Sequence, residues 1–315
     1  MSNVTASGRA ANLLLSLSLL GAPLTVALAQ NSAETPYDKI NAAAAASSIT
    51  THALRGGVSM LEGSGGNIGV LSGPEGLLLV DCGIAVSQKK IEAALQKLSK
   101  GQIRYAVLTH WHWDHADGNG WVRRQGAQLM ATGESIKRLS QTIRVEEWGH
   151  TFSPVPTADL PNVSLDGAKT LNFAGESVII RPYSHSHTDG DVSVYFQRAD
   201  ILVTGDTYWN GMYPFIDYMV GGSIDGMIEA AKANIEMATQ RSIVIPGHGP
   251  VSDRSGLVAF HDMLVDVRKQ VAALKAKGLS LQEVQAAKPT AAYDGKWGQS
   301  IISGGLFTAL VYRGV

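Results

Sequence analysis

The sequence predicts an α/β domain, because runs typical of strands alternate with segments typical of helices. Short apolar runs that predict strands occur at 68–71, 77–80, 103–108, 178–180, 192–196, 201–203 and 242–245. Apolar residues recur with helical spacing at 86–98, 223–239 and 257–277. Such alternation favours sheets and helices packed in layers. Polar residues suited to chemistry follow several of these strands, where α/β proteins build their sites.

The elements can be justified in chain order. The first two strands flank a turn at 72–76 that contains Gly and Pro. In the helix at 86–98, one face carries Ile91, Ala94, Leu95 and Leu98. The strand 103–108 leads directly into a histidine-rich segment, and 242–245 ends at Pro246-Gly247-His248. The helix 257–277 is basic near its C-terminal end, which suits the helix dipole. A short helix is expected at 281–287 and a turn at 293–298.

The N-terminal 29 residues resemble a secretory signal peptide. Arg9 precedes an apolar stretch, 13–28, which ends at Ala27-Leu28-Ala29, the small-x-small pattern of a cleavage site. Gly21 and Pro23 disfavour a membrane-spanning helix, and no basic stop-transfer flank follows. We expect cleavage after Ala29 and a bacterial periplasmic or secreted protein with no stable membrane insertion. Residues 30–55 are rich in Ala, Ser and Thr and are expected to be a weakly patterned lead-in.

Composition excludes several classes of function. The formal net charge is −1, with 45% hydrophobic and 17% charged residues, so nothing favours a nucleic-acid partner or disorder. The one cysteine, Cys82, excludes an intramolecular disulfide and a cysteine-based zinc finger within this sequence. Cys82 ends the apolar run 77–82, which favours a small buried residue over a reactive thiol.

A cluster of metal-competent residues follows the strand 103–108. His110, His112, Asp114 and His115 fall within six residues. Imidazole and carboxylate are ligands for zinc and related divalent metals. Alternation along the chain places His110 and His112 on one side, and a turn would direct Asp114 and His115 toward an adjacent position. Two pairs so close together indicate two metal ions.

His110-x-His112-x-Asp114-His115 resembles the HxHxDH motif of the metallo-β-lactamase-fold superfamily. Four shorter segments match in order: Leu79-Val80-Asp81-x-Gly83, His187-Thr188-Asp189-Gly190-Asp191, Thr204-Gly205-Asp206 and Pro246-Gly247-His248-Gly249. The resemblance covers about Val58 to Val251. It implies a four-layer αβ/βα sandwich with the metals at the edge between two mixed sheets. The expected domain spans 56–278, and 279–315 is expected to pack on it as a C-terminal extension.

The resemblance also implies a role for each matching residue. His110, His112 and His187 would hold one zinc ion, Asp114, His115 and His248 a second, and Asp206 would bridge both. Asp81 would orient a histidine ligand. His185 competes with His187, but the Thr-Asp-Gly that follows His187 matches the family pattern. His52, His150 and His261 have no partner at ligand spacing and are expected to be surface or packing residues.

The implied function is hydrolysis of a small-molecule substrate. In the family, a hydroxide that bridges two zinc ions attacks an ester, thioester, lactone or β-lactam carbonyl, and Asp114 would orient the water and pass a proton to the leaving group. Trp111, Trp113, Trp209 and Tyr213 are candidates for the substrate pocket, with core packing as the competing interpretation of each.

Two departures shift the expected substrate. Many zinc β-lactamases carry a cysteine where this chain has Asp206, and a lysine where it has Trp209. The aspartate bridge is more typical of thioesterases, lactonases and phosphodiester-cleaving members. Two alternatives stay open: a mononuclear iron enzyme resembling persulfide dioxygenases, and a non-catalytic periplasmic metal-binding accessory protein.

Overall fold

The structure is a computed structural model that describes residues 1–2 and 34–315. The predicted signal peptide, 1–29, lies outside the described residues apart from Met1 and Ser2. The folded unit described below is formed by residues 34–315. None of the helices in this described part combines the length and the apolar character needed to cross a bilayer.

Two mixed sheets form the centre of the domain. The first has the order β1 (Thr50–Ala53), β2 (Val58–Glu62), β3 (Ile68–Gly73), β4 (Gly76–Val80), β5 (Ile103–Val107), β6 (Gln128–Thr132) and β9 (Val163–Leu165). The second has the order β10 (Lys169–Phe173), β11 (Glu176–Pro182), β12 (Val192–Phe196), β13 (Ile201–Val203), β14 (Ile243–Ile245) and β15 (Ser252–Asp253). The two sheets contain both parallel and antiparallel pairs. β7 (Ile143–Val145) and β8 (His150–Phe152) form a separate hairpin.

The side chains of β4 show how the layers are built. Every residue of β4 is buried. Leu78 and Val80 belong to a core that also contains Val194 and Val203 of the second sheet. Leu77 and Leu79 belong to the other core, with Ile91 and Leu95 of α2 (Gln88–Leu98). Successive residues of β4 thus face alternately the covering helix and the opposite sheet, as the two-residue period of a strand requires.

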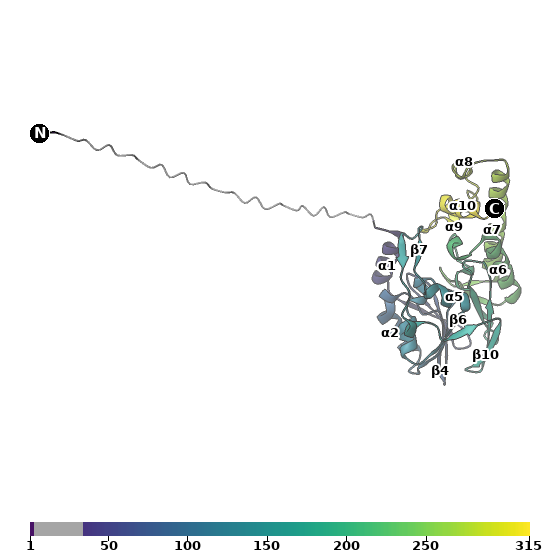
Figure 1. Ribbon diagram of the computed structural model, residues 1–315. Coiled ribbons are helices and arrows are strands. Elements are labelled where there is room, and N and C mark those ends of the chain that lie inside the picture. The colour runs from purple at the N-terminus through teal and green to yellow at the C-terminus, as the bar shows by residue number, and fades with distance from the viewer. Residues whose placement is uncertain (3–33) are drawn as a thin grey trace. The chain divides into compact units, whose positions relative to one another are not determined.

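The covering helices complete four layers. α1 (Pro36–Ala46) and α2 lie on one outer side, and α6 (Ile224–Met237) and α7 (Arg254–Ala276) on the other (Figure 1). Ser223 and Asp253 cap the first turns of α6 and α7 through their side-chain oxygens. The predicted four-layer αβ/βα sandwich with two mixed sheets is confirmed. The predicted strands and the three long helices occur within a few residues of their expected bounds.

Several elements differ from the sequence expectations. The expected turn at 293–298 contains a short helix, α9 (Asp294–Trp297). The structure adds elements that the sequence did not predict, including β1, β2, β6 to β10, α1, α3 (Trp113–Ala116), α4 (Asn119–Arg124), α5 (Gly133–Leu139) and α10 (Gly304–Arg313). The expected short helix is α8 (Leu281–Ala286).

The segment 34–55 is folded, which differs from the weakly patterned lead-in expected. A capping box between Thr35 and Asp38 begins α1, and β1 pairs with β2. At the other end of α1, the ammonium of Lys90 donates to the carbonyl oxygens of Ala45 and Ser47, both at 2.6 Å. At the C-terminus, Phe307, Leu310 and Val311 of α10 are buried in the same core as α7.

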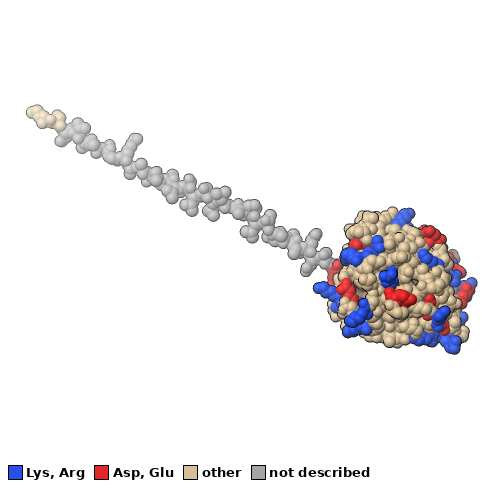
Figure 2. All heavy atoms as spheres, turned by 90° about the horizontal axis from the view of Figure 1, so that it is seen from below, with Lys and Arg blue, Asp and Glu red and all other residues tan. Residues whose placement is uncertain are grey.

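Charges of both signs are mixed over the surface. Figure 2 shows basic and acidic side chains interspersed on the face seen from below. This distribution agrees with the formal net charge of −1 and gives that face no basic stripe of the kind that attracts nucleic acid.

Candidate metal centre

The predicted ligands lie at one edge of the sandwich because each follows the end of a strand. His110 and His112 follow β5, and Asp114 and His115 lie in α3 directly after them. His187 lies between β11 and β12. Asp206 lies in the 3-10 turn Gly205–Thr207 after β13, and His248 follows β14. The residues that follow strands of both sheets therefore lie together at this edge.

The first group consists of His110, His112, His187 and Asp206. One ligand atom from each lies within 4.8 Å of the others, and all four residues are buried. Nε2 of His187 is 2.9 Å from Nδ1 of His112 and 3.3 Å from Oδ2 of Asp206. Nε2 of His110 is 3.7 Å from the same Asp206 oxygen.

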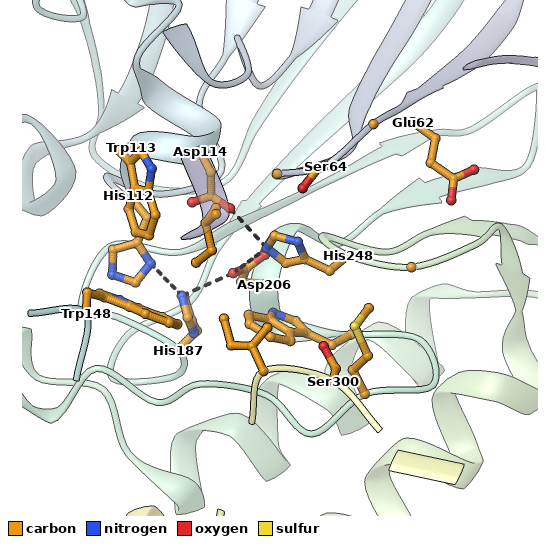
Figure 3. A pocket seen from close by; sticks show the side chains of 17 residues that line it. Glu62, Ser64, His112, Trp113, Asp114, Trp148, His187, Asp206, His248 and Ser300 are labelled. Carbon is orange, nitrogen blue, oxygen red and sulfur yellow. Dashed lines mark hydrogen bonds and ion pairs between the residues drawn. The ribbon is translucent and has the colours of Figure 1, made fainter. Parts of the chain in front are cut away.

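The second group consists of Asp114, His115 and His248, whose ligand atoms meet the same 4.8 Å limit. Nε2 of His248 is 3.3 Å from Nε2 of His115 and 3.3 Å from Oδ2 of Asp114. Asp206 also faces this group, with its oxygens 3.2 Å from Nε2 of His115 and 3.4 Å from Nε2 of His248. The structure thus brings together all seven predicted ligands, with Asp206 between the groups. Figure 3 shows the five that line a cavity: His112, Asp114, His187, Asp206 and His248.

Two buried atoms test whether metal ions fit this site. Nε2 of His110 and Oδ1 of Asp206 make no hydrogen bond to the described residues, although Oδ1 lies 3.2 Å from Nε2 of His115. Buried polar atoms are almost always paired, so an unpaired nitrogen and an unpaired carboxylate oxygen need another partner. Divalent cations accept electron pairs from both atom types. The side chains present therefore fit bound metal ions.

The pKa shifts of the histidines in the first group also favour a bound metal ion. Burial lowers the pKa of His187 to about 4, against the opposing effect of Asp206. Burial and the charge of His115 lower the pKa of His110 well below its usual value. Burial raises the pKa of Asp206, but the four surrounding histidines outweigh it and hold the pKa well below its usual value. His110 and His187 are thus held in the neutral form that binds a metal. In the second group, Asp206 and Asp114 outweigh burial and raise the pKa of His115 and His248.

Further contacts orient the ligand rings. Oδ2 of Asp81 accepts a hydrogen bond from Nδ1 of His115 at 2.8 Å, as the role expected for Asp81 requires. Oδ2 of Asp217 accepts from Nε2 of His112 at 3.0 Å. The carbonyl oxygen of Phe215 accepts from Nδ1 of His187 at 2.8 Å. These contacts fix which nitrogen of each ring faces the centre. Sequence analysis missed Asp217, which lies in no recognisable motif.

A glycine-rich loop between β2 and β3 covers the second group. Gly66 lies so close to His115 that an added Cβ would overlap the imidazole ring. Its amide donates to the carbonyl oxygen of Asp114 at 3.3 Å. The absence of a side chain at Gly66 therefore allows His115 to occupy its place in the cluster.

A cavity of about 280 Å³ opens onto the two groups. His112, His187, Asp206, Asp114 and His248 lie at its inner end, and Figure 3 shows Trp113 and Trp148 on one side of them. Trp113 and Trp209 line the cavity, as expected. The other lining residues were not predicted as pocket residues: Ile40, Glu62, Gly63, Ser64, Gly65, Trp148, Met212, Gly249, Ser300 and Ile301.

Trp111 and Tyr213 do not line this cavity, which corrects the sequence expectation. Trp111 is buried and packs edge-on against Phe152, with ring centres 5.5 Å apart, and against the ring of His112 at 4.9 Å. Tyr213 is fully buried and stacks on Phe307 at 4.7 Å. Core packing is thus the correct interpretation of both residues.

The remaining candidates lie elsewhere. His185 is exposed and its Nδ1 is 3.0 Å from the carbonyl oxygen of Gly221, so His187 is the histidine that joins the cluster. His52 contacts Glu62 at 2.6 Å, His150 stacks on Tyr37, and His261 contacts Asp262. Cys82 is buried, and burial raises the pKa of its thiol.

Replacing Asp217 tests the orientation of His112. We predict that Asp217→Asn weakens metal binding by about 10- to 100-fold, because His112 loses its charged partner. Competition with a chromophoric chelator measures this affinity. Asp225→Asn is the control, since Asp225 is exposed, pairs with Arg268 and does not line the cavity. Equal affinities for the two variants would contradict the role given to Asp217.

Adding a methyl group at Gly66 tests the fit of the second group. Gly66→Ala is predicted to displace His115 and to lower the metal content per chain below that of the unaltered protein. Gly167→Ala is the matched control, because an added Cβ there meets open space. Elemental analysis of both variants gives the number of metal ions per chain. An unchanged metal content in Gly66→Ala would show that the ring and the loop tolerate the methyl group.

The chain is similar in sequence to several known proteins. The sequence profile of the metallo-beta-lactamase superfamily matches residues 61–248. The probable metallo-hydrolase YqgX of Bacillus subtilis is 24% identical over 49% of this chain and 72% of its own length. The type 2 metallo-beta-lactamase of Bacillus cereus is 25% identical over 62% of this chain and 71% of its own. The linear primary-alkylsulfatase of a Pseudomonas species is 23% identical over 68% of this chain but only 48% of its own.

Solved structures show the same fold. A double mutant of the sec-alkyl sulfatase PisA1 aligns with a TM-score of 0.65 and 17% identity over 90% of this chain, which spans about half (53%) of that protein. The metallo-beta-lactamase from Pontibacter korlensis aligns with a TM-score of 0.56 and 19% identity over 69% of this chain and 99% of its own. With the profile covering more than half of the sequence, the chain belongs to the metallo-beta-lactamase superfamily, among its metal-dependent hydrolases.

Proposed function

We propose that this protein is a dinuclear zinc hydrolase that cleaves an ester, thioester, lactone or β-lactam bond of a small molecule. The observation that supports two ions is the position of Asp206. Its oxygens lie 3.3 Å from Nε2 of His187 in the first group and 3.2 Å from Nε2 of His115 in the second. A carboxylate between two complete groups of nitrogen and oxygen ligands is suited to a pair of metal ions.

The residues of the chain supply binding, orientation and proton transfer. Zinc ions held by the two groups would acidify water and polarise the scissile carbonyl. Asp114 lines the cavity beside His248, where its carboxylate can hold a proton and pass it to the leaving group. Trp113, Trp148 and Trp209 exclude water from the walls of the cavity and favour an apolar substrate.

Three other functions compete with this proposal. A mononuclear iron enzyme would need only the first group, whereas the second group is also assembled here. A non-catalytic metal-binding protein would keep both groups without turnover. A sulfate ester is a further candidate bond, because the likeness to the sec-alkyl sulfatase covers 90% of this chain, including segments that reach the cavity.

Metal analysis together with a substrate panel tests the proposal. We predict about two zinc ions per chain in protein purified without added metal, and hydrolysis of at least one compound among p-nitrophenyl esters, a lactone, a thioester and nitrocefin. An alkyl sulfate is added to the panel to test the competing bond. Asp114→Asn should lower kcat by about 10²- to 10⁴-fold. Asp159→Asn, at a surface carboxylate paired with Arg124, is the control.

Three results would contradict it. One iron ion per chain would favour the oxygenase alternative, and turnover of the alkyl sulfate alone would replace the carbonyl substrate with a sulfate ester. If both metal ions are bound and none of the compounds in the panel is hydrolysed, a non-catalytic protein is favoured.

We also propose that the protein is exported and acts in the periplasm or outside the cell. The support is Arg9 followed by the apolar stretch 13–28 and Ala27-Leu28-Ala29. When the full chain is expressed in a bacterium, we predict recovery from the periplasmic or extracellular fraction with Gln30 as the N-terminal residue. Recovery of the uncleaved chain from the cytoplasm would overturn this proposal.

A further inference from the structure

Part of the mouth of the cavity is built by segments outside the region that matches the family profile. The matched region runs from residue 61 to residue 248. Ile40 of α1 lies before it, and Ser300 and Ile301, which follow α9, lie after it, yet all three line the cavity. Resting on the proposed function, we propose that these flanking segments select substrates with an uncharged, apolar acyl chain, and that Ile40 and Ile301 are specificity-determining residues.

Contacts at both ends of α1 hold Ile40 in place. At its start, the amide of Tyr37 donates to the carbonyl oxygen of Trp148 at 3.2 Å. The Tyr37 ring stacks on His150 at 3.6 Å and lies 5.2 Å from the ring of Trp113. Lys90 holds the other end of the helix. α1 is therefore attached beside Trp113 and Trp148, which both line the cavity, and Ile40 extends their apolar surface.

The C-terminal side of the mouth is anchored by Tyr213. Its amide donates to the carbonyl oxygen of Trp297 at 2.8 Å, and its hydroxyl donates to Oδ1 of Asp294 at 2.9 Å. The side-chain amide of Gln299 donates to the carbonyl oxygen of Asp294 at 2.8 Å. These contacts tie α9 and the following loop to the segment that places Met212 in the cavity wall. Tyr213 thus supports the pocket without lining it.

Ile301 is the part of this mouth that a substrate would cover. Its side chain is 46% exposed, although most large apolar residues of the described chain are buried. Covering exposed apolar surface is favourable in proportion to its area. An acyl chain that leaves the metal centre between Ile40, Met212 and Ile301 would remove this surface from water.

Charge at the mouth disfavours anionic chains. Glu62 at the end of β2 lines the cavity, and Figure 3 shows it directed away from the ligand cluster, on the far side of His248. Of the three carboxylates that line the cavity, Asp114 and Asp206 belong to the ligand groups, and Glu62, at the mouth, contacts Nε2 of His52 at 2.6 Å. No lysine or arginine of the described chain lines the cavity. A carboxylate at the far end of an acyl chain would lose water beside Glu62 without gaining a cationic partner.

Three esters with one leaving group test the proposal on the zinc-loaded enzyme: p-nitrophenyl acetate, p-nitrophenyl hexanoate and mono-p-nitrophenyl adipate. The adipate has the chain length of the hexanoate but ends in a carboxylate. We expect kcat/KM for the hexanoate to exceed that for the acetate by about tenfold or more, because more methylene groups are buried. The adipate should fall about tenfold or more below the hexanoate.

A charge introduced at the mouth should reverse the preference. Ile301→Lys is expected to raise kcat/KM for the adipate and to lower it for the hexanoate. Val86→Lys is the matched control, since Val86 is also 46% exposed and does not line the cavity. It should leave the hexanoate-to-adipate ratio unchanged. The inference is overturned if the wild-type enzyme hydrolyses the hexanoate and the adipate with equal kcat/KM. It is also overturned if Ile301→Lys and Val86→Lys have the same hexanoate-to-adipate ratio.

Binding to metal-free protein separates this inference from the proposed function. Hexananilide and adipic acid monoanilide are neutral and anionic probes that can be titrated by quenching of tryptophan fluorescence from the cavity walls. Tighter binding of hexananilide, reversed in Ile301→Lys, supports the pocket even if none of the esters is hydrolysed, in which case only the proposed function fails. Equal binding of the two probes, or binding of neither, overturns the pocket inference even if the esters are hydrolysed.

Discussion

Burial of mutually interacting ionisable groups is the constraint on which the rest of this structure depends. Seven metal-competent side chains converge at one edge of an apolar sandwich, and imidazole nitrogens face one another at 2.9 and 3.3 Å. Polar groups removed from water are costly without partners, and charged groups more so. Bound cations satisfy nitrogens and carboxylate oxygens together. The metal centre is therefore part of what stabilises this edge, in addition to its role in chemistry.

The two sheets cooperate to hold this edge together. Asn67, between β2 and β3 of the first sheet, donates from its side chain to the carbonyl oxygens of Pro246 and Gly249, at 3.0 and 2.8 Å. It thereby clamps the loop of the second sheet that carries His248. The parallel pairing of β13 with β14 places Asp206 beside this loop, and a side chain at Gly247 would overlap the Asp206 carboxylate. The close approach of the Asp206 carboxylate therefore requires glycine between Pro246 and His248.

Local patterns explain why much of the fold could be predicted from the sequence. The strands β4, β5, β13 and β14 are short apolar runs, and the ligands lie within a few residues of their ends. α1 was missed because its run of alanines carries little amphipathic pattern, and its position depends on Lys90 and Trp148, which are distant in sequence. Tertiary contacts of this kind leave no periodic signal.

The site residues also divide into those that local sequence reveals and those that only tertiary contacts reveal. His110, His112, Asp114 and His115 are adjacent in sequence, so their chemistry is visible there. Asp217 acts on His112 from 105 positions away, and no spacing rule connects the two. Trp111 and Tyr213 were misassigned because an aromatic residue near a motif serves a wall or a core equally well in sequence terms. Only the packing of Trp111 on Phe152 and of Tyr213 on Phe307 decides between these roles.

The central claim is that two metal ions share Asp206, and crystallography with anomalous scattering at the zinc absorption edge tests it most directly. The account predicts two anomalous peaks. One would lie among His110, His112, His187 and Asp206, and the other among Asp114, His115, His248 and Asp206. A single peak in the first group, from crystals grown with excess zinc, would contradict the account.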